Sequence, residues 1–241
     1  MSPPANGPAF GATRHHHRVI DSTNERAREL VDEGAPSGTV VTADEQSAGR
    51  GRQGRTWTAP PGKALLFSAI LRPLSHRHRL LPLAVPLAVC EAAEELGSGA
   101  CRVKWPNDVW VAERKLAGVL IEARPPDWAV IGVGLNVAIE PDEFPEELRE
   151  TATSIGGDAE VEEAFEALCD ALERWVGADD EAVLDEFRRR DALAGREIRW
   201  TGAGAGAGRA EGVDPDGNLV VRLADGGVRA LGSGEVHLKL D

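Results

Sequence analysis

Apolar positions near the start of the chain recur at helical spacing over residues 27–31. Ser22 and Glu25, which precede them, have the spacing of a capping box, in which Ser22 would be the N-cap. Gly34 follows the apolar residues and is a plausible stop signal. The pattern therefore predicts a helix that begins just after Ser22.

Further along, short β-rich runs alternate with longer apolar segments. The short runs predict strands at residues 39–42, 64–72, 109–112, 115–123 and 128–139. Longer segments predict helices at residues 80–96, 159–176 and 180–191. In the first of these helices, we expect Pro86 to produce a kink or to delay the start.

The character of the chain changes after Gly195, where short β runs and turns replace the helical patterns. Residues 214–218, with the sequence DPDGN, are a strong turn signal between two such runs. We expect an α+β body over residues 1–193 and a small β-barrel-like domain over residues 194–241. The Gly-Ala run at 202–208 is interpreted as a flexible loop within that second domain.

Composition limits the possible classes. The 241 residues, 42% of them hydrophobic, are enough for a globular body with a small appended domain. No apolar stretch is long enough to span a membrane, and the first ten residues lack the features of a signal peptide, so we expect a cytoplasmic protein. Three widely spaced cysteines suit reduced core thiols. The formal net charge of −13 disfavours broad nucleic-acid binding.

The most informative segment is the glycine- and arginine-rich run at residues 45–57, EQSAGRGRQGRTW. Its three glycines allow backbone amides to approach an anion closely, and its three arginines supply positive charge. Trp57 could stack on a flat ring. Taken alone, the run also fits a solvated basic loop or a nucleic-acid contact, although the acidic remainder of the chain disfavours the latter.

Two further segments carry polar residues in apolar surroundings. Lys115 opens a predicted strand that contains Gly118, and glycine inside a strand often marks the close approach of a ligand. Alone, however, Lys115 could simply begin a strand at the surface. Residues 130–137 (VIGVGLNV) resemble half of a dinucleotide fingerprint, which is weak because the third glycine and a following helix are missing. Asn136 at the end of this run needs a polar partner.

In this order and spacing, the segments resemble the catalytic domain of the biotin–protein ligase family. The matching residues are 21–24 (DSTN), Gln46, the loop at 49–57, 104–108 (KWPND), 114–122 (RKLAGVLIE) and 132–136 (GVGLN). The C-terminal part resembles the small SH3-like domain of that family, so the resemblance covers nearly the whole chain from about residue 18. It implies a mixed-sheet ligase domain followed by an SH3-like β-barrel.

The resemblance also implies roles for individual residues. Ser22, Thr23, Asn24 and Gln46 would hydrogen-bond the ureido ring of biotin, while the loop with Arg50, Gly51 and Arg52 would order over biotin and the adenylate, near Gly118. Arg52 and Lys115 match the two cations at the reacting carboxylate and phosphate. Arg55, Trp57 and Asn136 match nucleotide contacts, and Asp108 is the candidate to orient or deprotonate the attacking lysine.

The implied activity uses ATP to form biotinyl-5'-AMP and then transfers biotin to a lysine of a biotin carboxyl carrier domain of an acyl-CoA carboxylase. The first step brings two anions together, and at about 4 Å and an effective dielectric of about 20 a like-charge pair costs about 4 kcal/mol. Two fixed cations can offset that repulsion. Mg²⁺ would accompany ATP, and no protein metal site is expected because phosphate oxygens and water hold such an ion.

Other interpretations remain open. A lipoate–protein ligase shares the catalytic fold, although the chain has no Arg-Arg-x-(Ser/Thr)-Gly-Gly-Gly segment. A non-catalytic ligand- or RNA-binding module could use the same arginine-rich loop. The segment before Ser22 is too short for a helix-turn-helix domain, so we expect no DNA binding. We interpret the histidines at 15–17 as mostly solvent-facing rather than as metal ligands, and an exposed sheet edge makes a homodimer conceivable.

Overall fold

The structure is a computed structural model that describes residues 9–201 and 204–238. The expectation about a signal peptide rests on residues that lie almost wholly outside this part of the chain, and so do residues 202–203 of the Gly-Ala run. The remainder of that run, from Gly206, is not a loop but the start of a strand.

Four helices and twelve strands form the described part of the chain. The helices are α1 (Thr23–Asp32), α2 (Leu81–Glu95), α3 (Val161–Val176) and α4 (Asp180–Arg190). The strands are β1 (Thr13–Ile20), β2 (Thr39–Gln46), β3 (Ala64–Leu71), β4 (Cys101–Lys104), β5 (Asp108–Val111), β6 (Arg114–Arg124), β7 (Trp128–Asn136), β8 (Glu197–Thr201), β9 (Gly206–Val213), β10 (Leu219–Arg222), β11 (Val228–Leu231) and β12 (Glu235–Leu238).

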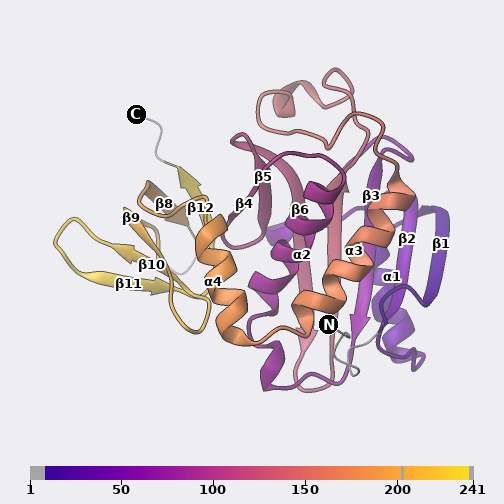
Figure 1. Cartoon of the computed structure of the whole chain (residues 1–241), viewed down its shortest axis with the longest axis horizontal. Coiled ribbons are helices and arrows are strands. Elements are labelled where there is room, and N and C mark those ends of the chain that lie inside the picture. Colours follow the sequence, from indigo (N-terminus) through magenta and orange to yellow (C-terminus); the bar gives the residue numbers. More distant parts are fainter. Residues whose placement is uncertain (1–8, 202–203, 239–241) are drawn as a thin grey trace.

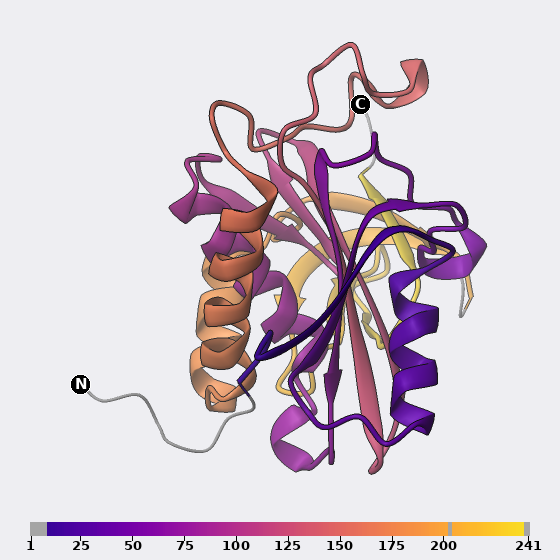
Figure 2. The same cartoon turned by 90° about the vertical axis from the view of Figure 1, so that its right-hand side faces the viewer.

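A seven-stranded sheet in the order β1-β2-β3-β7-β6-β5-β4 forms the body. β1 and β2 are parallel and are joined through α1, whereas the other neighbours are antiparallel, so the sheet is mixed as predicted. Figure 2 shows α1 on one face of the sheet and the layer of α2 and α3 on the other. The main core lies under α2 and α3, because alternate residues of β3, such as Leu65 and Phe67, point into it.

A second, antiparallel sheet in the order β11-β10-β9-β8-β12 forms the C-terminal part and lies beside the β4 end of the body (Figure 1). It has its own buried apolar residues, including Ile198, Leu219 and Val221. The indole Nε1 of Trp105 donates to the carbonyl oxygen of Gly217 at 3.1 Å and ties the two sheets together. The SH3-like topology and a boundary at residue 193 stay predictions.

The strands and helices predicted from the hydrophobic pattern are present, but two strands were missed. β1 has no apolar alternation because it is an edge strand with mostly exposed or half-buried residues. β4 is only four residues long. In α2, Pro86 does not delay the start of the helix, which begins at Leu81 and continues to Glu95, and a kink at Pro86 stays a prediction.

The capping box predicted for α1 is wrong. Ser22 is the N-cap, with extended backbone angles, but its side chain makes no capping hydrogen bond. The backbone N–H of Ser22, which the Glu25 side chain was expected to accept, donates to the side-chain oxygen of Asp21 at 2.7 Å. The backbone N–H of Thr23 donates to the side-chain oxygen of Gln46, also at 2.7 Å. The predicted stop is consistent with the structure, since α1 ends at Asp32 and Gly34 has a φ of 87°.

The three histidines lie on the edge strand β1. Only His16 is mainly exposed, and its ring contacts the Thr42 hydroxyl at 3.0 Å and the Asp44 carboxylate at 3.4 Å. His15 and His17 are half-buried, so the expectation of mostly solvent-facing histidines holds for one of them. Within residues 9–201 and 204–238, no three His, Cys, Asp or Glu side chains cluster as metal ligands. No helix in the same ranges has the length and apolar character needed to cross a membrane.

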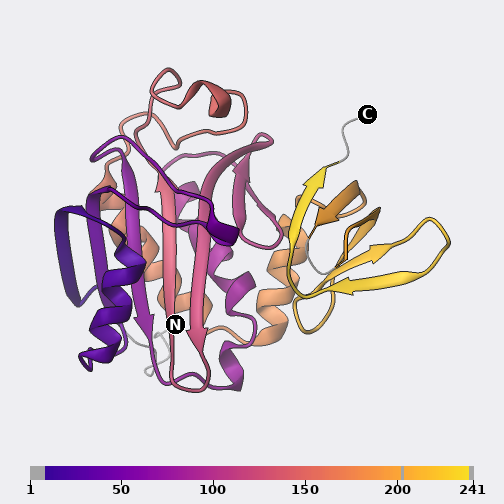
Figure 3. The same cartoon turned by 180° about the vertical axis from the view of Figure 1, so that it is seen from behind.

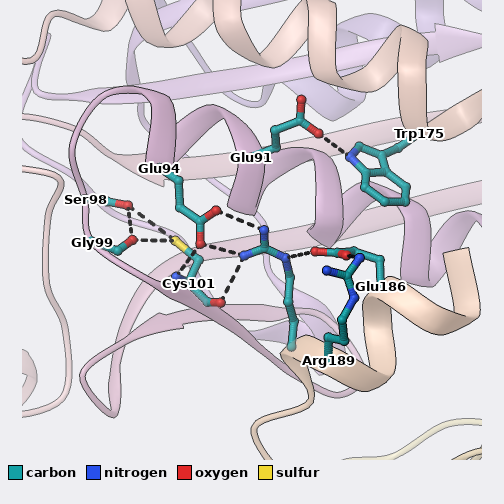
Figure 4. Close-up of polar contacts among 9 residues, drawn as sticks. Glu91, Glu94, Ser98, Gly99, Cys101, Trp175, Glu186 and Arg189 are labelled. Carbon is teal, nitrogen blue, oxygen red and sulfur yellow. Dashed lines mark hydrogen bonds and ion pairs between the residues drawn. The ribbon is translucent and has the colours of Figure 1, made fainter. Parts of the chain in front are cut away.

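Charged side chains join α2, α4 and the β4 edge of the sheet (Figure 4). The guanidinium of Arg190 donates to both carboxylate oxygens of Glu94, at 2.6 and 2.9 Å, and to Glu186 at 2.5 Å. Glu94 also accepts the backbone N–H of Cys101 at 2.8 Å. Burial favours a higher pKa for Glu94, but these hydrogen bonds outweigh it and lower the pKa. The cluster therefore holds α4, and with it the chain entering the second sheet, against the body.

Candidate active site

One cavity on the α1 face of the large sheet brings together residues from distant parts of the chain. The segment that follows β2 crosses this face beside α1 (Figure 3). Of the residues predicted to act, the cavity is lined by Ser22, Thr23, Asn24, Gln46, Arg50, Gly51, Arg52, Arg55, Trp57, Asp108, Lys115 and Gly118. The second sheet contributes Gly234, Glu235 and Val236. The cavity thus lies partly between the two sheets.

At one end of the cavity, polar side chains are held in fixed orientations. The side-chain oxygen of Gln46 accepts two hydrogen bonds from Thr23, one from its backbone N–H at 2.7 Å and one from its hydroxyl at 3.0 Å. Asn24 accepts a hydrogen bond from the buried hydroxyl of Ser68 at 2.6 Å and donates to the carboxylate of Glu122 at 3.0 Å. The sequence reasoning missed Ser68 and Glu122, although a lone hydroxyl in the apolar run of β3 was a usable signal.

The glycines of the β7 run make room for side chains from other elements. A Cβ atom on Gly132 would lie 2.1 Å from the Oδ1 atom of Asn24. Gly118 and Gly134 are cross-strand partners, and the indole of Trp57 lies against both, so a Cβ on Gly134 would lie 2.4 Å from its Cε2 atom. These glycines therefore lie within strands, where the absence of a Cβ atom lets Asn24 and Trp57 pack against the sheet, and they do not form a dinucleotide-binding loop. The indole Nε1 of Trp57 is buried there and has no hydrogen-bond partner among the described residues.

The lining of the cavity carries more positive than negative side chains. It includes five basic side chains, Arg50, Arg52, Arg55, Lys104 and Lys115, and two acidic ones, Asp108 and Glu235. This excess is notable in a chain with a net charge of −13 and favours an anionic ligand. Arg52 and Lys115 line the same cavity, as the sequence predicts, although they are far apart in the chain.

The two predicted reacting cations are each held by a neighbour from the 104–108 segment. Arg52 donates to the Asn107 side-chain oxygen at 3.3 Å, and the Lys115 ammonium lies 2.8 Å from the Asp108 carboxylate. Burial lowers the pKa of Arg52, an effect that nearby Asp108 opposes. Burial also lowers the pKa of Lys104, which Lys115 and Arg55 lower further against the opposing charge of Asp108. The site is therefore partly desolvated, which strengthens its electrostatics.

The glycine- and arginine-rich loop is closed by its own backbone. The N–H of Gly51 donates to the carbonyl of Arg55 at 2.7 Å, and the N–H of Trp57 donates to the carbonyl of Gly49 at 3.0 Å. A Cβ on Gly49 would lie 2.3 Å from the Trp57 carbonyl oxygen, so the approach requires glycine. The side chain of Arg55 forms an ion pair with Glu235 of β12. The loop thus reaches from the body to the second sheet.

Asn136 is the one predicted site residue that the structure does not bring into the cavity. It is 4% exposed, and its amide nitrogen donates to the carbonyl oxygen of Thr153 at 2.8 Å. In this conformation, its polar partner is the backbone of the segment that follows β7. A nucleotide contact by Asn136 stays a prediction.

Comparisons with known proteins agree with this geometry. The model of the biotin/lipoate A/B protein ligase family matches residues 17–136, and the model of the biotin protein ligase C-terminal domain matches residues 194–239. The biotin–[acetyl-CoA-carboxylase] ligase of Paracoccus denitrificans is 34% identical, over 84% of this chain and 91% of its own. The bifunctional ligase/repressor BirA of Escherichia coli is 31% identical, over 92% of this chain and 72% of its own.

Solved structures and further relatives give the same result. The Aquifex aeolicus biotin protein ligase in complex with biotin and ATP matches with a TM-score of 0.80 and 30% identity, over 95% of this chain and 100% of that one. The bifunctional ligase/repressor of Bacillus subtilis is 40% identical, but only over 58% of this chain and 45% of its own. The chain thus spans under half the length of that relative. With two relatives above 30% identity over more than two thirds of their length, the chain belongs to the biotin/lipoate A/B protein ligase family and, within it, to the biotin–protein ligases.

Proposed function

We propose that this chain is a biotin–protein ligase that uses ATP to form biotinyl-5'-AMP and then transfers biotin to a lysine of a biotin carboxyl carrier domain of an acyl-CoA carboxylase. The observation that carries the proposal is the shared cavity of Arg52 and Lys115, with Thr23 and Gln46 at its polar end. A molecule with a hydrogen-bonding ring and a carboxylate tail fits that arrangement of polar groups and cations.

In the first step, a carboxylate oxygen of biotin attacks the α-phosphorus of ATP, and the bond to the β-phosphate oxygen breaks to release pyrophosphate. Attacking group and target are both anionic. Arg52 and Lys115 offset their repulsion, and because Asn107 and Asp108 hold the two cations in place, little reorganisation is needed when charge develops. Mg²⁺ enters with the triphosphate as part of the substrate MgATP, consistent with the ion's preference for phosphate oxygens and water.

Nucleotide binding is assigned to Trp57 and Arg55, which lie in the same loop. The indole of Trp57 offers a flat face for a base, and Arg55 adds positive charge to the lining of the cavity. Since the indole packs directly on Gly118 and Gly134, a base has no room beneath it in this conformation and would stack on its other face or displace it. Closure of the loop over the adenylate would exclude water, which otherwise hydrolyses the mixed anhydride.

In the second step, the amine of the carrier lysine attacks the carbonyl carbon of the adenylate. The carbon–oxygen bond to AMP breaks, AMP leaves, and the amine loses a proton. Asp108 lines the cavity and is the proposed group that orients this amine or accepts the proton, which then passes to solvent. Its ion pair with Lys115 places that carboxylate next to the cation assigned to the reacting junction.

Pyrophosphate exchange into ATP tests the first step. We expect exchange that depends on biotin and is lost, by about 100-fold or more, when Arg52 is replaced by alanine. The matched control is Arg124→Ala, because the Arg124 side chain is 77% exposed and lies outside the cavity. Exchange with lipoate alone would indicate a lipoate ligase, and no exchange with either acid would indicate a non-catalytic module; both results would overturn the proposal.

Other expectations stay predictions. β1 is an edge strand of the large sheet, so two copies could pair through it, and the homodimer stays a prediction. The three cysteines are buried and free, which fits the proposed cytoplasmic location. Absence of DNA binding remains an expectation from the sequence.

A further inference from the structure

Ser68 lies beneath the polar end of the cavity without lining it. It is the one hydroxyl in the otherwise apolar strand β3 and is 0% exposed. Its Oγ atom lies 2.6 Å from the Oδ1 atom of Asn24 and 2.8 Å from the Oγ1 atom of Thr23. Gly132 is its cross-strand partner on β7, and only a glycine there leaves space for the Asn24 amide. A buried hydroxyl is thus built into contact with two residues that line the cavity.

Glu122 fixes the orientation of the Asn24 amide. The Nδ2 atom of Asn24 faces the Glu122 carboxylate at 3.0 Å and the backbone carbonyl of Leu120 at 3.4 Å, and both of these groups only accept hydrogen bonds. The Glu122 carboxylate also faces Arg50, whose guanidinium lies 3.6 Å away. The nitrogen of Asn24 must therefore face Glu122, which leaves its oxygen facing Ser68.

The direction of the next hydrogen bonds follows. Ser68 has a single hydroxyl proton, and Asn24 Oδ1 has none to offer, so Ser68 donates to Asn24. The proton of Thr23 then points toward protein, either to Ser68 or to the Gln46 oxygen at 3.0 Å. Thr23 keeps only acceptor capacity for a ligand.

Gln46, in contrast to Thr23, faces the ligand as a hydrogen-bond donor. Its side-chain oxygen already accepts the backbone N–H of Thr23 at 2.7 Å, so its amide nitrogen is the group that remains for a ligand. Thr23 and Gln46 therefore offer one acceptor and one donor to a ligand. A ureido group, with N–H groups beside a carbonyl, has the complementary pattern, whereas the dithiolane ring of lipoate has neither donor nor acceptor in that position.

We propose that Ser68 and Glu122, which do not line the cavity, are positioning residues that set the hydrogen-bond polarity of the biotin subsite. These residues form a hydrogen-bonded series, Glu122–Asn24–Ser68–Thr23. Because the Glu122 carboxylate only accepts hydrogen bonds, it fixes the direction of each bond in the series, so that the Thr23 hydroxyl faces the ligand as an acceptor. This inference rests on the proposed function, because it concerns how the same site selects a ureido ring.

The test measures biotin affinity by titration calorimetry, and the Michaelis constants for biotin and ATP in pyrophosphate exchange. Ser68→Ala removes the link, and we expect biotin binding to weaken about tenfold or more, equivalent to about 1.4 kcal/mol. Glu122→Gln lets the Asn24 amide turn over, with an expected loss of about threefold to tenfold. The KM for ATP should change less than about twofold in both variants, because neither residue contacts Arg52 or Lys115.

Two matched controls distinguish an effect on the hydrogen-bond direction in the biotin subsite from the simple loss of a hydroxyl or a carboxylate. Thr39→Val removes a hydroxyl that is 1% exposed on the neighbouring strand β2 and has no partner among the described residues. Glu25→Gln removes a carboxylate that also pairs with Arg50, at 3.0 Å, but is not among the hydrogen-bond partners of the Asn24 side chain. Both controls should bind biotin as the unmodified protein does. The double variant of Ser68 and Glu122 should be no more than about twofold weaker than Ser68→Ala, because both changes break one hydrogen-bonded series.

Biotin binding within about twofold of the unmodified protein in both variants would overturn the inference while leaving the proposed function intact. An equal loss in Glu25→Gln and Glu122→Gln would also overturn it, since the effect would then act through Arg50. If Ser68→Ala does not fold, Glu122→Gln decides alone, because Glu122 is 23% exposed and tolerates an amide. An unmodified protein that binds no biotin would instead refute the proposed function, and this inference with it.

Discussion

Replacing Gly134 with alanine tests whether the position of Trp57 controls the catalytic loop. The new Cβ would lie 2.4 Å from the Cε2 atom of the indole and 2.7 Å from its Cζ2 and Nε1 atoms. Non-bonded carbon atoms are normally about 3.5–4.0 Å apart, so one side must retreat by roughly 1 Å. Gly134 lies on β7, between β3 and β6 in the middle of the sheet, whereas Trp57 belongs to a loop. We expect the loop to move.

The shift should reach the reacting groups, because Arg52 lies five residues before Trp57 in the same loop. A misplacement of about 1 Å can reduce a rate by about 100-fold. We therefore expect kcat/KM for ATP in biotin-dependent pyrophosphate exchange to fall about 10- to 100-fold, or about 1.4 to 2.7 kcal/mol. The thermal midpoint should change by only a few degrees, since the half-buried indole can yield without disturbing the sheet.

A double-variant comparison identifies the cause. In a Trp57→Ala background, the clash is absent, so adding Gly134→Ala should reduce the exchange rate by less than about twofold. Unchanged kcat/KM in Gly134→Ala alone would refute the reasoning. An equal loss with and without the indole would do the same, because it would show that the strand itself had been damaged.

Three further outcomes follow from the geometry. The Arg52→Ala variant should release biotinyl-adenylate, which would then label lysines of a bystander protein, as detected by mass spectrometry. If this variant keeps the carrier specificity and the adenylate retention of the unmodified protein, the assignment of the loop is contradicted. Glu235→Gln breaks the ion pair with Arg55. This change should raise the KM for ATP by at most about fivefold, because a surface ion pair contributes about 1 kcal/mol or less. A rise in the KM for ATP of about 100-fold would mean that Glu235 acts on the substrate itself. Burial favours a raised pKa for Glu94, but the hydrogen bonds from Arg190 and from a backbone N–H outweigh burial and lower the pKa. The Glu94 carboxylate therefore stabilises the fold at pH values above its unfolded pKa. That stability is lost as the pH falls through the folded pKa. Glu94→Gln should therefore lower the free energy of unfolding by about 1–2 kcal/mol at about pH 7 and by less at about pH 3, as measured by urea unfolding, whereas equal deficits would contradict this sign.

The hydrophobic pattern was sufficient where burial governs the local structure. The apolar runs of β3 and β7 and the helical spacing of α3 were recognisable because these elements pack against the core. β1 escaped prediction because an edge strand leaves its side chains partly in solvent, so no alternation marks it. The capping box failed because the backbone N–H of Ser22, which Glu25 was expected to accept, donates instead to the side chain of its neighbour Asp21.

The site was predictable mainly through the resemblance to a family, and its physical reasons became visible only in three dimensions. The glycines at 132 and 134 looked like a weak dinucleotide motif, whereas they leave space for Asn24 and Trp57. Ser68 and Glu122 could not be found from spacing, because their contacts with Asn24 span 44 and 98 residues. Such partners depend on the register of the sheet, which sequence patterns do not specify.

The proposed activity is tested most directly by the mass of a carrier protein. A biotin carboxyl carrier domain is incubated with this chain, biotin and MgATP, and its intact mass is then measured. The account predicts a gain of one biotin per carrier, confined to one lysine and lost when Arg52 and Lys115 are both replaced by alanine. A carrier that remains unmodified, or that is modified equally by the double variant, would contradict the claim that these two cations form the reacting centre.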